Sequence, residues 1–77
     1  MIVRLLYKGK GQAQVVCPDE SQTKTYNFQS IDEACDYLAT ALLINEDDID
    51  DAVIKMHAHK HVVAIFDNGK LESTRFY

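Results

Sequence analysis

Residues 30–43, SIDEACDYLATALL, carry the strongest helix pattern in the chain. Ser30 and Glu33 have the spacing of a capping box, in which the serine hydroxyl and the glutamate carboxylate satisfy backbone amides that a helix start leaves unpaired. Behind them, apolar side chains recur at helical spacing on one face: Ile31, Ala34, Cys35, Leu38, Ala41 and Leu42. The pattern predicts a helix over residues 31–43.

The residues before this helix alternate between apolar and polar positions, which is typical of strands with one buried face. We expect strands over residues 2–8, 12–17 and 23–28. Residues 9–11, Gly-Lys-Gly, predict a hairpin loop between the first two strands, since glycine readily adopts positive φ. Pro18 has no amide hydrogen for a sheet and therefore ends the second strand. This part of the chain is predicted to be a three-stranded meander.

Residues 45–61 fit two structures. As a strand, residues 53–66 would run for about 14 residues, which is longer than strands usually are. As a helix, the segment has an acceptable N-cap in Asn45, acids near its positive end and histidines near its negative end. Its apolar face would consist of Ile49, Ala52, Val53 and Met56. We expect the helix, ending near Ala58.

The last third of the chain reads as a hairpin. Residues 62–66 are apolar on both faces, which indicates an interior strand, and residues 67–70, Asp-Asn-Gly-Lys, predict a type I′ turn into a final strand over residues 71–77. The predicted fold is a single α+β domain over residues 1–77. It has a five-stranded antiparallel sheet in the order βββααββ, with two helices packed on one face. The order of the strands within the sheet does not follow from the sequence.

Apolar runs and cysteines exclude two classes of protein. The longest apolar runs, residues 39–44 and 62–66, are far shorter than the roughly 20 residues of a membrane span. Cys17 and Cys35 fit neither a secreted disulfide framework nor a redox pair. We expect a cytoplasmic protein in a reducing compartment, present as a monomer or weak dimer and not bound to a membrane.

The formal net charge of −4 is unevenly distributed. Residues 1–30 and 52–77 each sum to +2, whereas residues 31–51 hold eight acids and no base, so that +2 − 8 + 2 gives −4. Acids four residues apart on a helix lie about 5–6 Å from each other, a pitch at which they can replace nucleic-acid phosphates in a basic groove. The candidate partner-binding residues are Asp32, Glu33, Asp36, Glu46, Asp47, Asp50 and Asp51. The alternative is that these acids only stabilise helix N-termini and hydrate the surface.

Three histidines, at positions 57, 59 and 61, are the weak candidates for a metal site. His57 and His61 would lie one turn apart on a helix, and neutral imidazole binds zinc, nickel or copper. However, no further strong ligand lies nearby, and a helix C-terminus favours cationic histidine without any metal. We therefore expect no metal and no cofactor, and keep a small metal- or ligand-binding accessory protein as the alternative function.

Enzymatic chemistry and direct nucleic-acid binding are both disfavoured. Cys17 and Cys35 lie on apolar faces, and a buried thiol is a poor nucleophile; residues 9–11 lack the spacing of a phosphate-binding loop. A base-stacking platform would need aromatic and basic side chains on one sheet surface, and the negative total charge opposes phosphate binding. Its components would be Tyr7, Tyr26, Phe28, Phe76 and Tyr77 with Arg4, Lys8, Lys24 and Arg75.

No family motif is present in the sequence. In size, single-domain build and localised acidity, the chain resembles the accessory proteins that phages and mobile elements use against host defence, such as anti-CRISPR and anti-restriction inhibitors. The resemblance implies a non-enzymatic, protein-binding inhibitor. Its acidic helical surface would engage a basic site on a partner that handles nucleic acid.

Overall fold

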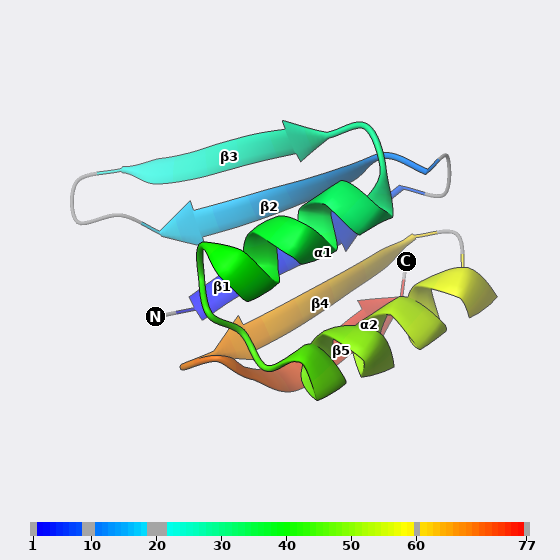
Figure 1. Cartoon of the computed structure of the whole chain (residues 1–77). Coiled ribbons are helices and arrows are strands. Elements are labelled where there is room, and N and C mark those ends of the chain that lie inside the picture. The colour runs from blue at the N-terminus through cyan, green and yellow to red at the C-terminus, as the bar shows by residue number, and fades with distance from the viewer. Residues whose placement is uncertain (1, 9–10, 19–21, 60, 77) are drawn as a thin grey trace.

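The computed structural model describes residues 2–8, 11–18, 22–59 and 61–76, and it confirms the predicted α+β fold (Figure 1). The five strands form one sheet in the order β3-β2-β1-β4-β5, and every neighbouring pair is antiparallel. The first strand of the chain is therefore the middle strand of the sheet. The elements are β1 (Ile2–Tyr7), β2 (Ala13–Pro18), β3 (Thr23–Phe28), α1 (Ile31–Thr40), α2 (Glu46–Ala58), β4 (Val62–Asp67) and β5 (Lys70–Phe76).

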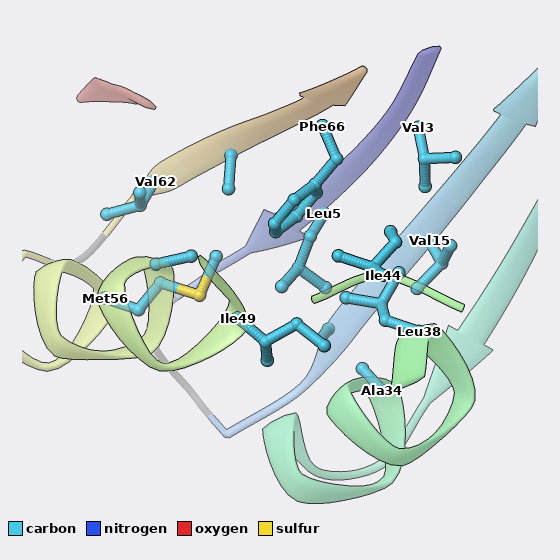
Figure 2. Close-up of a cluster of buried hydrophobic side chains, with 13 residues drawn as sticks. Val3, Leu5, Val15, Ala34, Leu38, Ile44, Ile49, Met56, Val62 and Phe66 are labelled. Carbon is cyan, nitrogen blue, oxygen red and sulfur yellow. The ribbon is translucent and has the colours of Figure 1, made fainter. Parts of the chain in front are cut away.

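Both helices lie on the same face of the sheet (Figure 1). α1 packs toward β2 and β3, and α2 packs toward β4 and β5. The core fills the space between the helices and the sheet (Figure 2). Burying each of its larger side chains stabilises the fold by roughly 1.5–3 kcal/mol. The side chains that are most completely enclosed are Val3, Leu5, Val15, Leu38, Met56, Val62 and Phe66.

The second face of the sheet is not covered by any element of the described residues (Figure 1). Strand side chains alternate between faces, and β4 shows this clearly, with Val62, Ala64 and Phe66 buried beneath the helices. Val63 and Ile65 point the other way and are only partly buried. We call this uncovered side of the sheet the open face.

The prediction that the first helix reaches Leu43 is wrong, because α1 ends at Thr40. Leu43 has a φ of 55°, in the left-handed region, and the amide of Ile44 donates to the carbonyl of Leu38 over 3.0 Å. This reversal buries Ile44 to 4% exposure and leaves Leu43 79% exposed. Packing of Ile44 in the core thus takes precedence over continuing the helical pattern.

The ambiguous second segment is a helix, as expected, and it ends at Ala58. The Asn45 side chain caps it by accepting a hydrogen bond from the Asp47 amide over 2.9 Å. One acid of this helix has a structural partner: Asp48 accepts a hydrogen bond from the Leu71 amide over 3.0 Å. Asp48 therefore fixes α2 to β5.

The β4–β5 hairpin has the predicted turn. Asn68 and Gly69 have φ values of 53° and 84°, the positive values that a type I′ turn requires. The Gly69 carbonyl accepts a hydrogen bond from the Asn45 amide over 3.0 Å. The hairpin tip is thereby joined to the linker between the two helices. The other predicted loop has Gly11 at φ 77°, while Gly9 and Lys10 lie outside the described residues.

Candidate functional site

An acidic hollow of about 420 Å³ lies between the two helices. Its floor consists of Cys35, Ala39 and Ile49, which are apolar or weakly polar and wholly or partly buried. Its rim carries five of the seven candidate carboxylates, namely Asp32, Glu33 and Asp36 from α1 with Glu46 and Asp50 from α2. No Lys or Arg of the described residues lines it. We call this site the acidic hollow.

Helical spacing explains why these acids converge. On α1, Asp32 and Asp36 are one turn apart, and on α2, Glu46 and Asp50 are one turn apart. The core side chains Ala34 and Leu38 direct one side of α1 into the protein, and Ile49 does the same for α2. The acidic stripes then meet where the helices pack against each other.

The remaining two candidates, Asp47 and Asp51, lie on α2 but do not line the hollow. All seven candidate side chains are exposed to solvent. The acids of the hollow are therefore accessible to a partner, and Asp47 and Asp51 extend the negative surface along α2.

The pKa of the Cys35 thiol is affected by its place in the hollow. Burial raises the pKa of its thiol to about 11, and the negative charges of Asp32, Asp50 and Asp36 contribute in the same direction. Asp50 belongs to the other helix, so the field at Cys35 comes from both sides of the hollow. Burial also raises the pKa of Cys17. Neither thiol is activated as a nucleophile, because a nucleophilic cysteine needs a lowered pKa.

The structure separates the three histidines. His57 is exposed on α2, the His59 ring lies 4.1 Å from the Phe76 ring, and His61 lies before β4 beside the open face. Since α2 ends at Ala58, His57 and His61 do not occupy one helical surface. Among residues 2–8, 11–18, 22–59 and 61–76, no group of three or more His, Cys, Asp or Glu side chains is arranged to hold a metal ion.

The aromatic and basic strand residues do not form one platform. Tyr26 and Phe28 pack against Tyr37 of α1, with ring centroids 5.2 and 5.5 Å away. Arg4 and Arg75 pair with Ile65 and Val63 in the sheet and so lie on the open face, opposite the helices. Strand alternation thus places Tyr26 and Phe28, together with Lys24, on the opposite face from Arg4 and Arg75; Tyr77 lies outside the described residues.

A groove of about 520 Å³ on the open face was not predicted from the sequence. It is lined by apolar side chains of β1 and β4, by basic side chains of β1 and β5, and by the lysine that follows β1: Leu6, Val63, Ile65, Arg4, Arg75 and Lys8. Two features of the sequence point to it. Arg4 and Lys8 alternate with core residues on the first strand, and residues 62–66 are apolar on both faces. We call this site the basic groove.

Comparisons with protein-family models, with curated proteins and with solved structures found no match. In the described part of the chain, no helix has both the length and the apolar character needed to cross a membrane.

Proposed function

We propose that this chain is a non-enzymatic protein-binding module whose acidic hollow engages a basic, nucleic-acid-binding site on a partner protein. The observation that carries the proposal is the convergence of five exposed carboxylates from two helices on one surface without a neighbouring Lys or Arg among the described residues. Such an array presents to a partner the charge that a phosphate backbone would present.

Helix stabilisation alone does not account for this arrangement. Asp32 and Glu33 lie in the first turn of α1, where they stabilise the helix dipole. Asp36 and Asp50 lie beyond the first turns of their helices, so the dipole gains little from them. Carboxylates brought close together repel each other, and a basic partner would relieve that repulsion.

The proposal extends to the biological class. A small inhibitor of a host complex that handles nucleic acid needs no active site. It needs only a surface that occupies the positively charged nucleic-acid-binding site of that complex. The acidic hollow has that character, and we therefore propose a phage or mobile-element inhibitor of the anti-CRISPR type. Its partner would be a nucleic-acid-handling complex with a positively charged cleft of its own.

A capture experiment tests the proposal. The immobilised chain should capture from host lysate a protein that itself binds nucleic acid, and added duplex DNA should displace that protein. Capture should weaken steeply with salt, since exposed charges are screened within about 8–10 Å at ordinary ionic strength. The Asp36→Lys, Asp50→Lys double variant should lose capture.

A matched control separates the hollow from net charge. Glu72 is exposed on β5, away from the hollow, so Glu72→Lys changes the total charge as much as Asp50→Lys does. We expect Asp50→Lys to weaken capture and Glu72→Lys to leave it intact. If the folded Asp36→Lys, Asp50→Lys variant captures the same protein with the same salt dependence, the acidic hollow is only a hydrated surface and the proposal fails.

A further inference from the structure

The basic groove is a second surface, independent of the acidic hollow and on the opposite side of the sheet. Its floor is made by Leu6 of β1, which pairs directly with Val63 of β4, and by Ile65, which lies two residues further along β4 opposite Arg4. A second, smaller hollow of about 300 Å³ continues the same face past Arg4 to Ile2 and Val16. The open face therefore carries an apolar surface that no described element covers.

Three cations surround the floor of the groove. Arg4 lies two residues before Leu6 on β1, Lys8 follows the end of β1, and Arg75 pairs across the sheet with Val63. The side chains of all three are exposed, and within the described residues none has a hydrogen-bond or ion-pair partner. The groove thus combines apolar contact area with unpaired positive charge.

The spacing of these cations matches one kind of ligand. Arg4 on β1 and Lys8 just past the end of β1 are four residues apart, or about 13 Å along an extended chain, while β1 and β5 are two strand spacings apart, or about 10 Å. An α-helix with its side chains is about 10–12 Å across. A helix resting on Leu6 and Val63 would therefore bring its flanks within reach of the surrounding cations.

Other occupants fit the groove less well. A small molecule would stay half exposed, because no element closes over the sheet, whereas ligand pockets bury most of their ligand. Single-stranded nucleic acid needs a row of stacking rings, and Tyr26, Phe28 and Phe76 lie on the helix side. The rings that do line the groove, Tyr7 and His61, lie together at one end of the β1–β4 pair and make no row along it. A second copy packed face to face would bring like charges together around Arg4.

We propose that the open face is a docking site for an acidic amphipathic helix of a partner protein. The apolar side of that helix would lie on Leu6, Val63 and Ile65, and its carboxylates would pair with Arg4, Lys8 and Arg75. The chain's own helices already cover the opposite face of the sheet in a similar way (Figure 1). With the acidic hollow on the other side, the molecule would have two docking faces of opposite charge.

Two synthetic peptides test this site with the full chain. One is an acidic helix of about 18 residues, with Leu at helical spacing on one side and Glu elsewhere; its counterpart has Lys in place of every Glu. In amide-shift titrations, the Glu peptide should perturb Leu6, Val63 and Arg75 and leave the α1–α2 surface unchanged. The Lys peptide should not perturb the groove; shifts around Asp36 and Asp50 would instead report on the acidic hollow.

Charge reversal within the groove provides the control. Arg75→Glu should weaken binding of the Glu peptide about tenfold, because a like charge then faces the peptide. Lys70→Glu makes the same change on β5 outside the groove and should leave the affinity unchanged. Arg75→Gln provides a milder variant should the reversal impair folding, and it should weaken binding by a smaller factor.

Two results would overturn the proposal. The first is that the Glu peptide causes no shifts on the open face up to its solubility limit, or binds equally well to wild type, Arg75→Glu and Arg75→Gln. The second is that the chain alone sediments as a dimer that Arg75→Glu dissociates, which would make the occupant a second copy. Neither result bears on the acidic hollow, whose own test uses Asp36 and Asp50.

Discussion

Leu43 occupies a backbone conformation that residues with a side chain rarely adopt. Its φ of 55° costs about 1–2 kcal/mol for a residue with a Cβ, and its 79% exposed side chain recovers little by packing. Leu43→Gly should remove this strain but make the unfolded chain more flexible, at a cost of about 0.4–1 kcal/mol. We expect a net gain near 0.5 kcal/mol, or about 2–4 °C in Tm by calorimetry.

Leu43→Ala is the matched control for this substitution. It removes the same exposed side chain but keeps the Cβ, so the strain should remain and Tm should change little. A Leu43→Gly protein that melts below the Leu43→Ala protein would show that the left-handed residue is not a source of strain.

Cys35 gives a chemical measure of the acidic hollow. Because its pKa is about 11 instead of 9.0, its thiolate fraction at pH 8 is about a hundredfold smaller. A thiolate of high pKa is more nucleophilic, and this offsets part of the loss. Iodoacetamide should therefore react with Cys35 about tenfold more slowly than with an exposed thiol of ordinary pKa. Asp50→Asn should accelerate the reaction a few-fold, as measured by mass spectrometry of the peptide that contains Cys35.

Asp51→Asn removes the same charge from the neighbouring position, outside the hollow, and should leave the Cys35 rate unchanged. Equal rates for Asp50→Asn and Asp51→Asn would mean that α2 does not bring Asp50 to the thiol. The raised pKa also sets a pH dependence, because the folded state holds the Cys35 proton more tightly than the unfolded state does. The resulting contribution to stability is present below pH 9.0 and is lost as the pH rises through about 11.

Among the turns, Gly11 and Gly69, the glycines within the described residues, differ in what surrounds them. Both have positive φ, 77° at Gly11 and 84° at Gly69. A Cβ at Gly11 would meet nothing within 4 Å, whereas at Gly69 it would lie 3.5 Å from the Leu43 carbonyl oxygen. Gly69 also holds the Asn45 amide through its own carbonyl, so the backbone there cannot relax freely.

We expect Gly11→Ala to cost about 1 kcal/mol of unfolding free energy, which is the backbone strain alone. Gly69→Ala should cost about 2 kcal/mol, because relaxation of the turn would also weaken the hydrogen bond to Asn45. Urea unfolding of both variants measures the difference. Equal costs would show that the hairpin tip and the helix linker are not coupled.

Local patterns predicted most elements of this fold. The capping residues Ser30 and Asn45 each accept the expected backbone hydrogen bond, and the Asn68-Gly69 turn forms as expected, because each depends only on residues near it in the chain. The end of α1 was not predicted, since it depends on Ile44 entering a core built from distant strands. The order of the strands could not be predicted either, because it depends on pairings between residues far apart in the chain, such as Val3 with Phe66.

The candidate site was predictable only in part for the same reason. The acidity of residues 31–51 is a property of the sequence, but the convergence of Asp36 with Asp50 depends on how the helices pack. Asp48 shows the limit most plainly. The nearby acids Asp47 and Asp50 are exposed, whereas the carboxylate of Asp48 accepts a hydrogen bond from the Leu71 amide, a partner that no local pattern indicates.

At the scale of the whole molecule, the fold has one buried layer between helices and sheet and one uncovered sheet face. Leu5 and Leu6 are neighbours on β1 but lie on opposite sides of it: Leu5 is fully buried, and Leu6 is partly exposed on the open face. Leu5→Ala should cost about 2–5 kcal/mol, as truncations in a packed core do. Leu6→Ala should cost about 1 kcal/mol, because Leu6 loses less buried area.

Urea unfolding of the two variants provides the measurement. In a domain of this size, the Leu5→Ala cost approaches the whole stability, so that variant should be partly unfolded without denaturant. A Leu6→Ala variant as unstable as Leu5→Ala would mean that the open face is covered in solution, for example by a second copy.

The central position of β1 has a consequence for biosynthesis. Because translation runs from the N-terminus, β1 leaves the ribosome before its partner β4, which follows only after two strands and two helices. Until β4 emerges, the nascent meander presents an unpaired β1 edge, the kind of edge that pairs with other chains. Closure of the sheet is a late step between distant segments, and such steps are slow. Crowded polysomes making this protein would therefore be most prone to aggregation in the interval before β4 pairs with β1.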